Sequence, residues 1–225
     1  MKSPVDSTAR RLVIFDCDGV LVDSERIVHT VLSRRLLDLG VALTLSETVE
    51  AFIGGSDARD LAVIEELTGS APSAEFIRRF KRETKEALDL VAPVNGVFEA
   101  LDCIGGDQCV ASNGSHAKMQ QTLGRTGLLA RFQGRIFSAE DVAFPKPAPD
   151  VYLLACATLG YDPTECVVIE DTAIGVAAAR AAGMLVFGFA GLTPSALLRA
   201  AGAHCVFESM ADLDRLLSTS PGNLG

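Results

Sequence analysis

Residues 12–24 read LVIFDCDGVLVDS, and this stretch decides how the chain is interpreted. Residues 12–15 are apolar on both faces, which is typical of a buried strand in a parallel sheet. Asp16 and Asp18 follow at a spacing of two, so an extended chain turns both carboxylates to one side and Cys17 to the other. Functional groups in open α/β sheets gather at the carboxyl ends of strands. The plain alternative is an Asp-Gly turn that merely ends a strand.

Two neighbouring carboxylates repel each other and need a compensating cation. Residues 12–24 hold neither Lys nor Arg. We therefore expect a divalent metal ion at this position, and oxygen ligands favour Mg²⁺.

Further polar side chains follow later apolar runs. Ser112 and Asn113 come before a Gly turn whose N–H groups could cradle a phosphate, although both residue types are also good helix caps. Lys146 lies between two prolines, and a solvated loop Lys is the alternative there. Glu170 and Asp171 end another apolar run, where helix capping is the competing role. Taken together, these groups and the first carboxylate pair predict a metal site with a nucleophile and a phosphate clamp at one edge of one sheet.

Strand-like and helix-like segments alternate along most of the chain, and a Gly follows several of the helix-like segments. This alternation predicts a Rossmann-like, doubly wound α/β fold with a parallel sheet. The expected strands are 12–15, 109–111, 166–169, 185–189 and 205–207, and the expected helices are 96–104, 115–123, 150–159, 172–182 and 194–201.

Residues 24–92 interrupt this alternation with helical patterns and no convincing strand. Thr44 and Glu47 have the spacing of a capping box. A crossover between parallel strands normally needs one helix, so we expect an inserted helical cap domain over 24–92. The α/β core domain would then consist of residues 1–23 plus 93–225.

The composition argues against several classes of partner and of location. The 225 residues carry 20 Lys and Arg against 29 Asp and Glu, a formal net charge of −9. This balance argues against nucleic-acid and anionic-membrane partners, which need positive fields. No apolar run reaches the roughly 18 residues of a membrane span. The six cysteines form no C-x-x-C pair, so we expect free thiols and a cytoplasmic location.

With these motifs in place, the chain resembles the haloacid dehalogenase superfamily along nearly its whole length, and within it the β-phosphoglucomutase-like and 6-phosphogluconate phosphatase-like subgroup. Residues 16–24 look like the first motif, Ser112 the second, Lys146 the third, and Glu170 with Asp171 the fourth. The insertion is similar to the family's mobile helical cap of the C1 type. Asp18 is present, which is the phosphotransferase form of the first motif.

The resemblance implies a role for each site residue. Asp16 would attack phosphorus and form an aspartyl-phosphate, while Asp18 would act as acid and then base. Mg²⁺ would be held by the Asp16 carboxylate, the Asp18 carbonyl and Asp171. Glu170 is counted among the metal-site residues as well, and it would orient Lys146 or a metal-bound water. Ser112, the Asn113 backbone and Lys146 would hold the phosphoryl oxygens.

The resemblance leaves the reaction open between a sugar-phosphate phosphatase and a β-phosphoglucomutase-type mutase. The mutases carry a His twelve residues after the nucleophile, where this chain has Val28. Residues 110–120 and 137–138 look most like bacterial 6-phosphogluconate phosphatases. Cap residues Gly54, Gly55 and Arg59 are candidate substrate contacts, with Arg59 a candidate for the substrate's carboxylate.

A function of another class is a catalytically silent protein that binds phosphorylated metabolites as a regulator. In either case the expected partner is a small phosphorylated molecule. The sequence leaves the oligomeric state open between a monomer and a weak dimer.

Overall fold

The computed structural model describes residues 11–52 and 57–218, with the backbone alone at positions 57 and 58. The described residues form one six-stranded sheet in the order β3-β2-β1-β4-β5-β6, and every pair of neighbouring strands is parallel. This order reverses on either side of β1, as in doubly wound folds. The predicted fold class is confirmed. The strands are β1 (Leu12–Phe15), β2 (Asp107–Ser112), β3 (Ile136–Ser138), β4 (Cys166–Glu170), β5 (Leu185–Phe189) and β6 (Cys205–Phe207).

The first strand alternates between two cores. Val13 and Phe15 belong to one buried cluster, whereas Leu12 and Ile14 belong to another. Helices α5 (Val97–Cys103), α6 (His116–Arg125) and α10 (Leu213–Ser218) cover the first face. Helices α7 (Asp150–Leu159), α8 (Ala173–Ala181) and α9 (Ser195–Ala200) cover the second. Because both faces are covered, residues 12–15, 109–111, 166–169 and 185–189 are uninterrupted by polar side chains, which is the signal that identified these strands.

Two elements were not predicted, β3 and α10. The β3 strand is three residues long and pairs only with β2. A three-residue strand has no periodicity that sequence alone can reveal.

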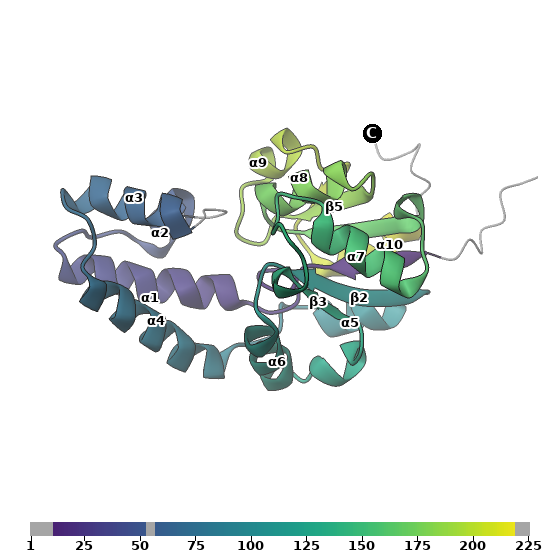
Figure 1. The fold of residues 1–225 in the computed structure, drawn as a ribbon, viewed down its shortest axis with the longest axis horizontal. Helices are drawn as coiled ribbons and strands as arrows, with labels where there is room; N and C mark the ends of the chain where they lie inside the picture. Colours follow the sequence, from purple (N-terminus) through teal and green to yellow (C-terminus); the bar gives the residue numbers. More distant parts are fainter. Residues whose placement is uncertain (1–10, 53–56, 219–225) are drawn as a thin grey trace, which may run out of the picture.

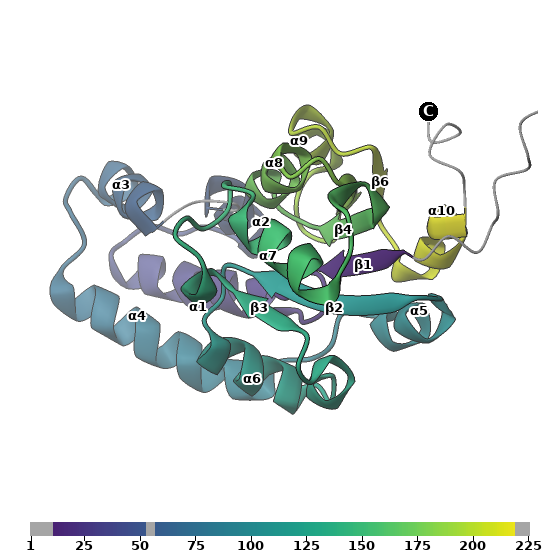
Figure 2. The same ribbon diagram turned by 45° about the vertical axis from the view of Figure 1, so that its right-hand side comes forward.

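Residues 24–92 form a helical unit of their own. Its helices are α1 (Ser24–Asp38), α2 (Leu45–Phe52), α3 (Asp57–Thr68) and α4 (Ala74–Ala87), followed by the short helix η1 (Leu88–Leu90). Figures 1 and 2 show α1 to α4 together at one end of the molecule. Leu32, Leu36, Phe52 and Ile64 make a separate apolar cluster there. Division into a core of 1–23 plus 93–225 and a cap of 24–92 remains our proposal.

Local chemistry explains where α2 begins and where the helical unit joins the sheet. The Thr44 amide donates to the Glu47 carboxylate at 2.8 Å, and the Glu47 amide donates to the Thr44 hydroxyl at 3.2 Å, so the predicted capping box is confirmed. The two connections to the sheet lie side by side, because the Asp23 amide donates to the Ala92 carbonyl at 3.0 Å. Among the described residues, no helix is long and apolar enough to cross a membrane.

Candidate active site

The carboxyl ends of β1, β2 and β4 bring the predicted site residues together. Phe15 pairs with Val110 on one side and with Ile169 on the other. Asp16 therefore leaves the sheet level with the ends of β2 and β4, beside Ser112 and Glu170.

Lys146 ties these three strands to each other. Its Nζ donates to Asp16 Oδ1 at 2.6 Å, to Glu170 Oε1 at 2.8 Å and to the Ala111 carbonyl at 2.9 Å. The side chain is buried. Burial alone would lower the pKa of this ammonium, but the Asp16 and Glu170 charges outweigh it and raise the pKa well above its usual value. Lys146 is thus a permanent cation inside the site.

Asn113 holds the Lys146 loop in place. Its side-chain oxygen accepts from the Lys146 amide at 2.9 Å, and its side-chain nitrogen donates to the Lys146 carbonyl at 3.2 Å. This positioning contact was not expected from the sequence, which suggested only backbone contact with phosphate. Ser112 Oγ accepts from the Gly114 amide at 3.2 Å and lies buried at the end of β2.

Asp16 is a carboxyl group with an unusual affinity for protons. Its pKa is raised to about 7, mainly by burial; the Lys146 charge lowers the pKa, and the Glu170 and Asp18 charges raise it. The carboxylates of this cluster therefore repel one another more strongly than the single Lys146 charge offsets.

Asp18 accepts two hydrogen bonds from groups outside its own strand. Ser24 Oγ donates to Oδ1 at 2.5 Å, and Lys118 Nζ donates to Oδ2 at 2.8 Å. Lys118 lies on α6, and the sequence did not point to it. Its position six residues after Ser112 carries no recognisable signal, because only the fold turns it toward Asp18.

Glu170 has both oxygens engaged. Oε1 accepts from Lys146 and from the Tyr152 hydroxyl at 3.1 Å, and Oε2 accepts from the amide and hydroxyl of Thr172, each at 2.9 Å. The Cβ of any larger residue at Gly175 would overlap this carboxylate. Of the two roles expected for Glu170, these contacts favour orienting Lys146 over binding a metal.

Asp171 supplies the feature that a metal ion would explain. Its side chain is 2% exposed, and its Oδ1 is buried without a hydrogen-bond partner. Burial, reinforced by the charges of Glu170 and Asp16, raises its pKa well above the usual value. Buried polar atoms normally have partners, so an unpartnered carboxylate oxygen beside other carboxylates fits a hard divalent cation.

The described His, Cys, Asp and Glu side chains nevertheless do not form a ready cluster of three metal ligands. Mg²⁺ usually keeps several of its waters and needs only a few protein ligands. The carboxylates of Asp16 and Asp171 and the backbone carbonyl of Asp18 would therefore be enough, without a cluster of three such side chains. This smaller set fits the geometry better than one that also counts the Glu170 side chain.

The candidate cap residues are separate from this cluster or lie outside the described part. Gly54 and Gly55 fall outside the described residues. Arg59 is exposed, donates to the Ala51 carbonyl at 2.9 Å and lies 3.8 Å from Asp60. These contacts are within the helical unit, and the proposed contact of Arg59 with a substrate carboxylate stays a prediction.

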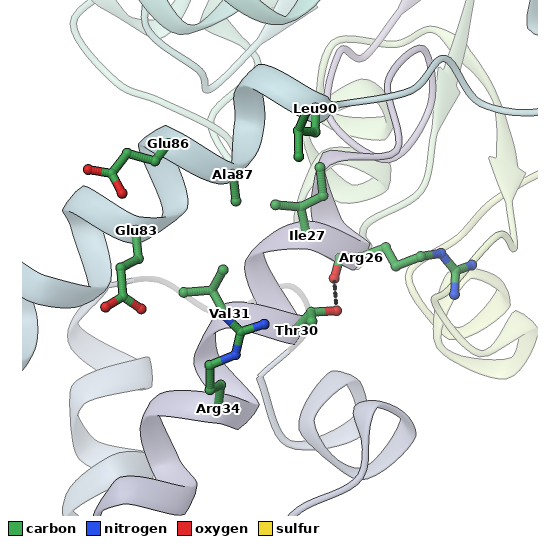
Figure 3. A pocket seen from close by; sticks show the side chains of 9 residues that line it. All are labelled: Arg26, Ile27, Thr30, Val31, Arg34, Glu83, Glu86, Ala87 and Leu90. Atoms are coloured by element: carbon green, nitrogen blue, oxygen red, sulfur yellow. Dashed lines mark hydrogen bonds between the residues drawn. The ribbon is translucent and has the colours of Figure 1, made fainter.

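Three hollows border α1; one of them, of about 230 Å³, is lined by Gly19, Asp171 and Arg26, and the other two lie along the helical unit. A cavity of about 310 Å³ reaches from Lys118 and Glu25 into the helical unit. The second is an open groove of about 550 Å³ between α1 and α4, with Arg26 and Arg34 on α1 and Glu86 on α4 (Figure 3). Among the described residues, neither of these two hollows is lined by a predicted site residue, but the cavity adjoins the site through Lys118, which bonds Asp18.

Comparisons with known proteins show which proteins this chain is similar to. A 6-phosphogluconate phosphatase from Escherichia coli is 30% identical, over 79% of this chain and 81% of its own length. The crystal structure of a haloacid dehalogenase-like protein from Agrobacterium tumefaciens is similar with a TM-score of 0.89 at 36% identity, covering 93% of this chain and 98% of that one. A hydrolase of the same family from Deinococcus radiodurans, solved with bound phosphate and sodium, has a TM-score of 0.83 at 31% identity, covering 95% and 96%.

The family model for haloacid dehalogenase-like hydrolases matches residues 13–189. That range runs from β1 through β5 and includes all four predicted motifs together with the helical unit. This chain therefore belongs to the haloacid dehalogenase-like hydrolases.

Proposed function

We propose that this chain is a Mg²⁺-dependent phosphatase that hydrolyses a small phosphorylated metabolite through an aspartyl-phosphate on Asp16. One observation carries the proposal. Lys146 is buried between Asp16 and Glu170, while Asp171 keeps an unpartnered oxygen beside them. A nucleophilic carboxylate, a fixed cation and a carboxylate oxygen free to bind a metal are the parts that phosphoryl transfer needs.

In the first step, an Asp16 carboxylate oxygen attacks phosphorus and the bond from phosphorus to the ester oxygen breaks. Asp18 gives its proton to the departing alcohol oxygen. Lys146 and Ser112 hold the phosphoryl oxygens as their charge redistributes. When bound, Mg²⁺ would be held by Asp16, Asp171 and the Asp18 carbonyl, and it would supply positive charge to the phosphoryl group.

In the second step, Asp18 takes a proton from a water molecule, whose oxygen attacks the phosphorus of the aspartyl-phosphate. The bond from Asp16 to phosphorus breaks, and inorganic phosphate and the original carboxylate are regenerated. The bonds from Ser24 and Lys118 to Asp18 support this step, because both donate to the ionised form that acts as base.

A mutase is the second candidate, and the geometry supports it less. Val28 occupies the position where the mutases have His. The neighbouring His29 is buried, with its Nδ1 2.7 Å from the Glu25 carbonyl. A mutase would isomerise glucose 1-phosphate without releasing phosphate, so the same assay distinguishes the two reactions.

The proposal also includes a reference substrate and a cellular location. The name of the 30% identical relative makes 6-phosphogluconate the reference compound for the phosphatase assay. Six free cysteines support a reducing, cytoplasmic location.

The test is phosphate release from p-nitrophenyl phosphate and a panel of phosphomonoesters, with and without Mg²⁺. We expect release that requires Mg²⁺ and is lost in Asp16→Asn. Asp38→Asn, an exposed carboxylate in α1, is the matched control and should keep full activity. Absence of hydrolysis throughout the panel would favour the silent metabolite-binding function.

A further inference from the structure

The cavity of about 310 Å³ beside Asp18 has walls that differ chemically from the catalytic cluster. Eight apolar side chains from α1, α2, α3 and α4 contribute to its lining: Val28, Leu32, Phe52, Leu61, Ile64, Phe76, Ile77 and Phe80. Leu32, Phe52 and Ile64 belong to the apolar cluster of the helical unit, and Phe76 and Phe80 pack against it. The cavity is therefore an opening into the apolar core of the helical unit.

Two charged residues connect this cavity with the catalytic cluster. Lys118 lines it and donates to Asp18 at 2.8 Å. Glu25 also lines it and directly follows Ser24, whose hydroxyl donates to the other Asp18 oxygen. Asp18 is the group that we place at the leaving alcohol. The body of that alcohol would therefore continue past Lys118 and Glu25 into the cavity.

The apolar wall selects against an alcohol that carries a hydroxyl on every carbon. Each hydroxyl moved from water to an apolar wall loses hydrogen bonds unless the wall returns them. His29 lines the cavity with its Nδ1 bonded to the Glu25 carbonyl, so Nε2 is the ring nitrogen left to bond a ligand hydroxyl. The other charged residues of the lining are Asp60 and Lys81, and most of the described wall consists of apolar side chains without hydrogen-bonding groups.

The size of the cavity also points to a ligand. An apolar cavity of about 150 Å³ is enough to take up benzene. The volume here is about 310 Å³, roughly twice as large. Interiors of folded proteins are otherwise closely packed, so an opening of this size next to reactive groups indicates a binding site.

We propose that the leaving alcohol of the substrate carries an apolar ring or branched alkyl group, and that the cavity lined by Val28, Leu32 and Phe80 accepts this group. The proposal rests on the phosphatase function above and assigns its substrate class. Phosphate lies at Asp16 and Lys146, the ester oxygen at Asp18, and the apolar group inside the helical unit. A sugar acid with a hydroxyl on every carbon would match this wall poorly.

The test compares three esters of primary alcohols: ethyl phosphate, 2-cyclohexylethyl phosphate and 6-phosphogluconate. Because the three alcohols are similar as leaving groups, differences in kcat/KM report mainly how well each alcohol fits the cavity. From the transfer free energy of buried hydrocarbon, we expect kcat/KM for the cyclohexyl ester to exceed that for ethyl phosphate by at least about thirtyfold. It should also exceed the value for 6-phosphogluconate. A higher kcat/KM for 6-phosphogluconate would overturn the proposal.

Substitutions at Val28 then test whether this cavity is responsible. Val28→Phe fills it, and we expect the preference for the cyclohexyl ester over ethyl phosphate to fall at least about tenfold. Val28→Ala enlarges it and should lower the preference less than Val28→Phe does. Leu37→Phe adds the same ring to α1 at a position that is 60% exposed. It should change neither kcat/KM for the cyclohexyl ester nor kcat/KM for ethyl phosphate.

The outcomes separate the two proposals. An unchanged preference in a folded Val28→Phe protein, checked by its melting temperature, would overturn the cavity assignment. Hydrolysis of p-nitrophenyl phosphate combined with preference for 6-phosphogluconate overturns the apolar substrate class and leaves the phosphatase standing. Loss of hydrolysis for every ester would instead reject the phosphatase function itself.

Discussion

Lys118 Nζ donates a 2.8 Å hydrogen bond to Asp18 Oδ2, so a lysine from α6 contacts the carboxylate that the mechanism uses as acid and base. Lys118→Met removes this donor and should lower kcat/KM about 10- to 100-fold, within the range of a misplaced acid–base group. Lys118→Arg keeps a cationic donor and should recover part of the loss. Lys81→Met is the matched control, because Lys81 lines the same cavity from α4. Equal losses in Lys118→Met and Lys81→Met would contradict a specific role at Asp18.

Glu170 should be a stability determinant as well as a positioning residue. Glu170→Gln removes the charge that faces buried Lys146, and breaking a buried ion pair destabilises by about 3–5 kcal/mol. Tyr152→Phe removes only the 3.1 Å hydrogen bond to Glu170 and should destabilise by about 1 kcal/mol. Urea denaturation of both variants measures the two free energies of unfolding. A Glu170→Gln protein as stable as the wild type would show that Lys146 is adequately paired by Asp16 alone.

Gly19 should tolerate no side chain. Its φ is +77°, and a Cβ there would overlap the Asp171 carboxylate. Gly40 is the comparison position: its φ is +84°, but no atom of the described residues lies within 4 Å of the place that a Cβ would take. A substitution at Gly40 therefore measures the cost of backbone strain without a steric clash. Gly40→Ala should destabilise by about 1 kcal/mol and keep activity, whereas Gly19→Ala should destabilise further and lose activity. Thermal unfolding and phosphate release are the measurements, and similar results for the two variants would argue against a close approach of Gly19 to Asp171.

Mg²⁺ should bind more tightly as the pH rises from 6 to 8. Burial raises the pKa of Asp16 to about 7 in the metal-free protein, so at pH 6 most molecules carry a proton on this carboxyl group. The cation must displace that proton, and the carboxylate fraction alone changes the apparent Kd by about tenfold between pH 6 and 8. Titration calorimetry in two buffers of different ionisation enthalpy would also detect the released proton. A Kd that does not change with pH would contradict Asp16 as a metal ligand.

The sequence was sufficient for the parts of the fold that long patterns define. Residues 12–15 and 166–169 are apolar throughout because helices cover both faces of the sheet, and parallel strands place their carboxyl ends at one edge. Asp16, Ser112, Lys146 and Glu170 could therefore be grouped from the sequence alone. For Asp16, Ser112 and Glu170 the prediction depended on the strand whose end each residue marks, whereas Lys146 was identified in its loop between two prolines.

Other features could not be predicted from the sequence, because they depend on how distant segments meet. Lys118 reaches Asp18 only because α6 packs on the sheet face that carries Phe15, and the engagement of both Glu170 oxygens depends on Tyr152 and Thr172. The Asn113 side chain takes a structural role for the same reason, since its partner is 33 residues away. The lining of the cavity likewise combines α1, α3 and α4, whose relative placement no local pattern specifies.

The central claim is that Asp16 is phosphorylated during turnover, and trapping the intermediate tests it most directly. The protein is mixed with Mg²⁺ and a hydrolysed phosphomonoester, quenched in acid within the first turnovers, digested and analysed by mass spectrometry. We expect one phosphoryl group on the peptide that contains Asp16, absent without Mg²⁺ and absent in Asp16→Asn. Steady hydrolysis by an Asp16→Asn protein, with no phosphorylated peptide at any quench time, would contradict the account.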